Sequence, residues 1–280
     1  MLLYISTLAL RNYSIQEILR IAEEKNWSIE FSSGIPFNEN IDQLYKNTSI
    51  KRIPHNYFPA PKVPFVLNLA SSNQEIRKKS ISHCKNGLLL AKHSNAPFYS
   101  AHAGFCIDPN PEELGKKIAI TTKFEKKNNL DLFKESINEL LDFAFELNLD
   151  FLIENNVIAQ FNLVDNENPL LCTNSDDIID LFDKIDRPNF HLLLDTGHLK
   201  VSSQTLGRDI DEELNKIKKY IKAVHHSDND GFSDTNDLLD ESYWFSKNIS
   251  TFSNLIHVLE VNTNTISDIE SQFKIIAKWM

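Results

Sequence analysis

Short apolar runs alternate with helix-periodic stretches along all 280 residues of the chain. Runs of four to eight mostly apolar residues that end in turn-forming residues predict buried strands. The predicted strands cover residues 2–7, 27–32, 51–57, 97–102, 150–156, 189–195, 221–227 and 254–262.

The stretches between these runs carry apolar side chains every three or four residues, which predicts amphipathic helices. Ser14 precedes the first of them and is expected to cap it. The predicted helices cover residues 14–25, 41–46, 72–94, 132–148, 175–185, 209–219, 239–248 and 265–279.

Eight strand–helix units in a row predict parallel strands joined by helical crossovers. Because no Pro/Gly-rich linker or composition break interrupts them, we expect one domain over residues 1–280, an α/β (β/α)8 TIM barrel. The competing fold is a doubly wound open sheet. Such a sheet normally carries a Gly-rich phosphate loop after its first strand, and this sequence has none there.

Ionisable side chains occur where seven of the eight predicted strands end: Glu30, His55, His102, Glu154, Asp195, His225 and Glu260. In a TIM barrel these ends gather at one rim, which is where active sites lie. His198 follows Asp195 by three residues, and we expect Gly197 to permit the turn that brings it to the same rim.

Alternate strand residues face the barrel interior, and this parity points Glu154, Asp195, His225 and Glu260 the same way. Buried acids without a counter-charge are costly, and no lysine or arginine stands at these strand ends. The pattern therefore predicts a divalent metal ion, with ligands that suit Mn²⁺, Mg²⁺, Co²⁺ or Zn²⁺.

Other strand-end residues have simpler explanations. Glu30 is as well explained by a helix cap or a loop salt bridge as by a metal. His257 is expected to be packed or exposed, and His226, of opposite parity to His225, to face the helix layer.

Composition narrows the function classes further. The formal net charge of −10 argues against nucleic acid as a partner, and three cysteines without metal-ligand spacing argue against a disulfide framework. The N-terminus lacks a basic region and a cleavage site, so it is expected to form a strand. No apolar run approaches the ~18 residues of a membrane span, and we expect a cytoplasmic protein.

Several motifs resemble the xylose isomerase-like barrel superfamily, which holds sugar and sugar-phosphate isomerases and epimerases together with apurinic endonucleases. They are "SAHAGF", "LIENN", "LLLDTGHL" and "VHHSDNDGFSDTND". The resemblance implies that Glu154, Asp195, His225 and Glu260 are the four shared metal ligands. It implies further ligand positions of trinuclear zinc members at His55, His102, His198 and Asp234.

One position departs from the trinuclear pattern. Those members carry Asp-x-His after the seventh strand, whereas this chain has Asn236 in the histidine place. We therefore expect one to two metal ions per chain.

The first functional hypothesis is a sugar or sugar-phosphate isomerase or epimerase of carbohydrate metabolism. Glu154 and Glu260 would exchange a proton on either side of a metal-stabilised enediolate, and His198 would orient a hydroxyl or complete the coordination. Arg52 and Lys200 are candidates for a phosphate contact. Such barrels often pair, so a homo-oligomer is a further expectation.

Two alternatives remain open from the sequence. His55 and His102 favour a metal-dependent phosphoesterase of the apurinic endonuclease type, whereas Asn236 and the acidic charge oppose it. A barrel that binds a ligand without turning it over is the third possibility, and the retained Glu154/Glu260 pair opposes that one.

Overall fold

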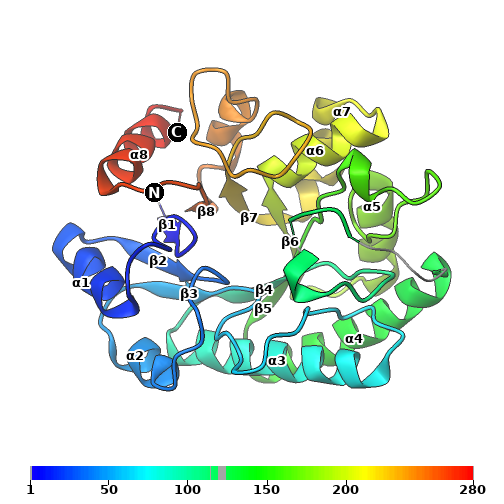
Figure 1. Cartoon of the computed structure of the whole chain (residues 1–280), viewed down its shortest axis with the longest axis horizontal. Coiled ribbons are helices and arrows are strands. Elements are labelled where there is room, and N and C mark those ends of the chain that lie inside the picture. The colour runs from blue at the N-terminus through cyan, green and yellow to red at the C-terminus, as the bar shows by residue number, and fades with distance from the viewer. Residues whose placement is uncertain (1, 114, 119–123, 280) are drawn as a thin grey trace.

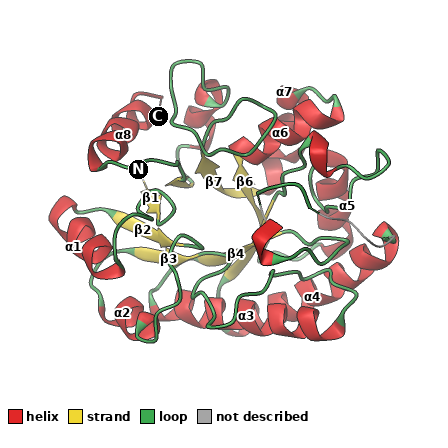
Figure 2. Ribbon diagram, viewed as in Figure 1, coloured by secondary structure: helices red, strands yellow, loops and turns green. Residues whose placement is uncertain are grey.

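Parallel strands form a nearly closed barrel, with helices around its outside (Figures 1 and 2). The structure, a computed structural model, describes residues 2–113, 115–118 and 124–279. Its strands are β1 (Leu2–Ser6), β2 (Ser28–Phe31), β3 (Arg52–Pro54), β4 (Phe98–His102), β5 (Asp150–Glu154), β6 (Phe190–Asp195), β7 (Ile221–His226) and β8 (Ile256–Leu259).

The strand order is β3-β2-β1-β8-β7-β6-β5-β4, which is the order of a barrel opened between β3 and β4. A parallel bridge from His55 to Ser100 spans that opening just after β3. The predicted (β/α)8 TIM barrel is thereby confirmed. Because all strands run the same way, their carboxyl ends meet at one rim.

The helices are α1 (Ile15–Lys25), α2 (Ile41–Asn47), α3 (Gln74–His93), α4 (Lys126–Glu146), α5 (Ser175–Ile185), α6 (Thr196–Leu206), α7 (Ile210–Ile217) and α8 (Ile266–Trp279). Short 3-10 turns add η1 (Pro111–Glu113), η2 (Gln160–Asn162), η3 (Lys218–Tyr220) and η4 (Ser246–Phe252). Ser14 caps α1 as predicted, within a complete capping box with Glu17.

One helix was missed and one helix prediction was wrong. The predicted helix over 209–219 is confirmed as α7, but α6, which begins directly after β6, was not predicted. The predicted helix over 239–248 is not helical before η4. Leu239 and Tyr243 are four residues apart, as on one face of a helix, but they and Phe245 are buried side chains of a loop. Tyr243 and Phe245 pack against His226 of β7.

The barrel interior is apolar up to the rim. Leu152, Leu193, Ala223 and Val258 each stand two residues before a rim residue of their strand and are fully buried. The alternation of side chains along a strand then turns the rim residues inward as well. No helix within the described ranges is both long and apolar enough to cross a membrane.

Candidate metal centre

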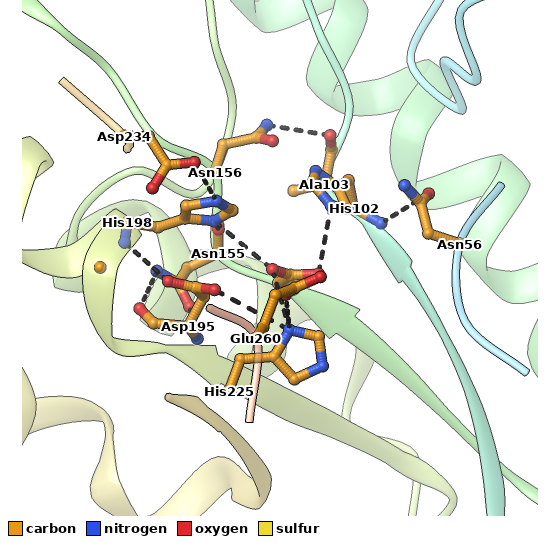
Figure 3. A network of polar contacts seen from close by, with 12 residues as sticks. Asn56, His102, Ala103, Asn155, Asn156, Asp195, His198, His225, Asp234 and Glu260 are labelled. Carbon is orange, nitrogen blue, oxygen red and sulfur yellow. Dashed lines mark hydrogen bonds and ion pairs between the residues drawn. The ribbon is translucent and has the colours of Figure 1, made fainter. Parts of the chain in front are cut away.

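Four side chains from four neighbouring strands converge at the carboxyl-end rim of the barrel. Figure 3 shows three of them, Asp195, His225 and Glu260. Glu154 and Asp195 end β5 and β6, His225 lies in β7, and Glu260 directly follows β8. Each offers one potential ligand atom, and these atoms lie within 4.8 Å of one another. The structure thus brings together the four residues that strand parity selected.

His225 is the centre of this cluster, which we call the rim tetrad. Its Nδ1 lies 2.6 Å from Glu260 Oε2, 3.6 Å from Glu154 Oε1 and 3.8 Å from Asp195 Oδ2. All four residues are buried except Glu260, whose side chain is 13% exposed. A ligand can therefore approach the tetrad past Glu260.

The two carboxylate oxygens of Asp195 have different surroundings. Oδ1 accepts the backbone N–H of His198 at 2.7 Å and so caps the N-terminus of α6. Oδ2 has no hydrogen-bond partner and faces His225. Asn155 fixes the backbone of Asp195 through both its side-chain oxygen and nitrogen. The free oxygen is thus held in place by strand and helix together.

Gly197 does not act as a flexible turn residue, contrary to the prediction. It lies in the first turn of α6 and is not among the glycines with positive φ. A Cβ there would stand 2.5 Å from Ser227 Oγ and 3.1 Å from Asn229 Nδ2. Glycine is required because α6 packs closely against the segment after β7.

Two further residues, Glu30 and Ser6, contact members of the tetrad without belonging to it. Glu30 at the end of β2 is fully buried, and its Oε2 lies 3.0 Å from His225 Nε2. Ser6 donates a hydrogen bond of 3.0 Å to Glu260 Oε1. Glu30 is neither a helix cap nor a loop salt bridge. It is a carboxylate placed on the far nitrogen of a candidate ligand, a pairing that orients metal-binding histidines.

A second cluster shares Glu154 with the tetrad. His55 Nε2 and His102 Nε2 lie 3.1 and 3.2 Å from Glu154 Oε2, and these three ligand atoms form another potential metal group. The hydroxyl of Ser100 contacts His55 Nδ1 at 2.8 Å, which leaves Nε2 to face the cluster.

His198 and Asp234 form a pair beside both clusters. His198 Nε2 lies 3.2 Å from Asp234 Oδ2, and its Nδ1 is 2.8 Å from the backbone oxygen of Asn155 (Figure 3). The two belong to none of the groups of three or more potential ligands in the described residues. Of the eight predicted metal ligands, six therefore fall into such groups.

Attraction between His225 and the neighbouring carboxylates determines which residues of the tetrad are charged. Burial disfavours the imidazolium of His225, but Glu30, Glu260 and Glu154 raise its pKa well above the usual value. Burial also disfavours ionised Glu260, but His225 lowers its pKa to about 2. Burial raises the pKa of Asp195 to about 7. Without a metal, the cluster therefore keeps a proton on His225.

The donor set fits a divalent cation. Glu154 Oε2, Asp195 Oδ2 and His225 Nδ1 are buried next to other ligand atoms but make no hydrogen bond of good geometry, although such atoms are rarely left unpaired. Among the described residues, no lysine or arginine forms an ion pair with the tetrad acids. Three carboxylates and one imidazole match the oxygen-rich sites of Mn²⁺, Mg²⁺ and Co²⁺ as well as Zn²⁺.

The two predicted phosphate contacts lie elsewhere or are occupied. Arg52 begins β3 at the opposite end of the barrel, where its guanidinium donates to the carbonyls of Thr48 and Ile50. Lys200 lies near the rim, but its Nζ is paired with Asp228 at 2.6 Å. Neither is a free cation for a substrate phosphate.

His226 faces the helix layer, as its parity predicted. Its Nε2 lies 2.7 Å from His257 Nδ1, and its Nδ1 is 2.9 Å from the Tyr243 hydroxyl. Tyr243 also contacts Thr196 at 2.7 Å. His257 is packed, and the network ties the loop after β7 to the start of α6 on the outer side of the barrel.

A cavity of about 420 Å³ opens beside the clusters. His102, His198 and Asp234 line it on the metal side. Its other walls come from the segments after β3, β4 and β5 and include Tyr57, Phe65 and many further apolar side chains. The position is that of a substrate chamber next to the candidate centre.

Residues 13–270 match the family described as xylose isomerase-like TIM barrel, and the chain belongs to that family. The resemblance seen in the motifs is thereby confirmed. No curated protein matches the chain in sequence.

Solved structures share the fold over nearly the whole chain. A D-tagatose 3-epimerase-like protein is 18% identical, with a TM-score of 0.74 over 100% of this chain and 97% of its own. A 3-keto-D-glucoside 4-epimerase from E. coli is 11% identical, with a TM-score of 0.69 over 100% and 98%. The IOLI protein with a bound zinc atom is 14% identical, with a TM-score of 0.70 over 100% and 99%.

Proposed function

We propose that the protein is a divalent-metal-dependent isomerase or epimerase that acts on a sugar. The convergence of Glu154, Asp195, His225 and Glu260 within 4.8 Å carries the proposal. The epimerases among the structural relatives support the reaction class, and the relative with bound zinc supports the metal. A cation bound by the tetrad would act as a Lewis acid toward the carbonyl and neighbouring hydroxyl of an open-chain sugar.

The protein residues divide the remaining work. Glu154 and Glu260, which both lie near His225 Nδ1, would take and return the proton of the carbon next to the carbonyl. Asp195 and His225 would hold the cation, and Glu30 would keep His225 oriented. His198, at the cavity wall, would donate to a substrate hydroxyl.

Deuterium exchange tests this proposal whichever product the reaction forms. The manganese-loaded protein would be incubated in D₂O with a panel of ketoses, aldoses and their glycosides, and the carbon-bound protons followed by NMR. We expect deuterium at the carbon next to the carbonyl of the accepted sugar. Glu154→Gln and Glu260→Gln should each lower the exchange rate at least about a hundredfold. No exchange with any sugar by the metal-loaded protein would refute the proposal.

A metal-dependent phosphoesterase is the second candidate because His55 and His102 add a histidine-rich group to Glu154. An isomerase with one metal ion does not need that second group. Zinc-loaded protein would be assayed with bis(4-nitrophenyl) phosphate and with abasic DNA. Hydrolysis that is lost in His102→Ala, together with no deuterium exchange on sugars, would establish this function instead.

A further inference from the structure

The lining of the cavity beside the metal clusters is mostly apolar. Its imidazole and carboxylate groups are those of His102, His198 and Asp234, which belong to the candidate metal centre or lie beside it. The rest of the lining, which we call the wall, includes six side chains that offer a ligand almost only carbon. These are Tyr57, Phe65, Leu67, Phe105, Val157 and Leu170.

Two of the three asparagines that line the cavity already donate to the backbone, and the third, Asn56, accepts the backbone N–H of His102. Asn156 Nδ2 donates to the carbonyls of Ala103 and Gly104, and Asn162 bonds to the backbone at Lys116 and Ile118. A polyhydroxylated chain placed against this wall would leave hydroxyl groups without partners, which is unfavourable in a buried space. The wall therefore disfavours a free sugar tail.

The wall also offers no counter-charge. None of the described residues that line the cavity is a lysine or an arginine. Lys200, near the rim, is held by Asp228, and the cavity itself contains Asp234. A phosphate group would meet carbon and the His198–Asp234 pair, whose Nε2 and Oδ2 atoms lie 3.2 Å apart, instead of a free cationic donor of the kind that binds phosphates in proteins.

The apolar wall is preformed. Phe65 donates its backbone N–H to the Tyr57 hydroxyl at 2.7 Å, and His83 packs behind both rings. Asn68 binds both the amide nitrogen and the carbonyl oxygen of Phe105. These contacts hold the rings of Tyr57 and Phe65 and the backbone of Phe105 without a ligand, so little ordering is needed when an apolar group binds.

From this arrangement we infer that the substrate is a neutral, unphosphorylated hydroxycarbonyl sugar that carries an apolar substituent, such as an alkyl or aryl group. The inference rests on the proposed function, because the sugar end must reach the rim tetrad. Its apolar end then lies between Phe65, Phe105 and Leu170. A sugar phosphate is thereby disfavoured as the substrate.

Hydroxamates test the two ends of the cavity separately, because they present adjacent carbonyl and hydroxyl oxygens but do not react. Acetohydroxamate, 3-phenylpropionohydroxamate, xylonohydroxamate and phosphoglycolohydroxamate would be titrated calorimetrically into manganese-loaded protein. We expect the phenyl compound to bind about tenfold to a hundredfold more tightly than acetohydroxamate, from the apolar area that its ring buries. The polyhydroxylated and phosphorylated compounds should show no such gain.

A pair of variants locates the effect. Phe65→Ser should remove most of the gain from the phenyl tail and leave the affinity for acetohydroxamate unchanged. Phe145→Ser is the matched control, since Phe145 is 69% exposed on α4 and is absent from the cavity lining. It should change neither affinity.

The possible failures are distinguishable. Acetohydroxamate binding without a gain from the phenyl tail, or a larger gain from the phosphate or the hydroxyls, would overturn this inference and leave the proposed function standing. If none of the four hydroxamates binds to the metal-loaded protein, the proposed function fails and the inference fails with it.

Discussion

Asp195 shows how one side chain serves the fold and the candidate site together. One oxygen caps α6, and the other faces His225 without a partner. The sequence suggested only the second role, because an aspartate at a strand end looks the same whether or not a helix starts beside it. The two roles respond differently to substitution.

Asp195→Asn should lower the affinity for Mn²⁺ at least about a hundredfold, because the amide cannot supply the anionic ligand. Asparagine is as good a helix cap as aspartate, so the free energy of unfolding of the metal-free protein should not fall. Asp195→Ala should lose the metal as well and also destabilise the metal-free protein by about 1 kcal/mol. Calorimetric metal titration and urea unfolding measure the two effects. Full metal affinity in Asp195→Asn would remove Asp195 from the ligand set.

Glu30→Gln tests whether the carboxylate on His225 Nε2 supports metal binding. We expect the metal affinity to fall about tenfold to a hundredfold, because a neutral amide makes His225 a less basic and less well oriented ligand. Glu39→Gln makes the same chemical change at an exposed position and should have no effect. Equal affinities in the two variants would mean that Glu30 contributes only packing.

At the scale of elements, strand parity predicted the rim residues but not the partners behind them. Ser6, Glu30 and Ser100 are separated by tens to hundreds of residues from the side chains they contact. No periodicity encodes such pairs, because they depend on which strands the barrel places opposite each other. Glu30 was one of the strand-end residues that the sequence identified, but its contact with His225 was not predicted.

In segment 239–248 the sequence predicted a helix that the structure does not form. Leu239 and Tyr243 have the four-residue spacing of one helix face, yet Tyr243 is used for contacts with His226 and Thr196. These contacts and the burial of Tyr243 decided the conformation. Helix propensity is a weak preference that such tertiary contacts override.

The close contact of α6 with the segment after β7 can be tested through Gly197. Gly197→Ala should lower the free energy of unfolding by about 1–2 kcal/mol, because the new Cβ meets Ser227 Oγ. Ser227→Ala removes that oxygen, and the double variant should recover most of the loss. Urea unfolding of the metal-free proteins provides the measurement. An unchanged stability in Gly197→Ala would show that the segment yields at little cost.

At the scale of the whole molecule, the concentration of buried charge links stability to metal and pH. Burial opposes the charged forms of His225 and His198, but the surrounding carboxylates raise both pKa values well above normal. Groups with a raised pKa stabilise the fold at low pH, and this contribution is lost as the pH rises above about 6.5 toward the folded pKa. A bound cation would replace the lost positive charge.

The thermal midpoint of the metal-free protein should therefore fall between pH 6.5 and 8.5 more than that of the manganese-loaded protein. The difference between the two forms should widen by several degrees, on the order expected for about 1–2 kcal/mol. Differential scanning calorimetry with EDTA, and with EDTA saturated by Mg²⁺ as the control, measures it. A difference that does not change with pH would contradict this account of the tetrad.

Local patterns in the sequence were enough to predict the barrel, the rim and the four converging residues. Strand alternation and strand–helix order suffice because parallel strands must end together. Three properties depend instead on how the barrel packs: the contact of Glu30 with His225, the place of Arg52 at the far end, and the mostly apolar lining of the cavity. These properties arise between segments far apart in the chain, where distance and burial are set by packing of the whole barrel.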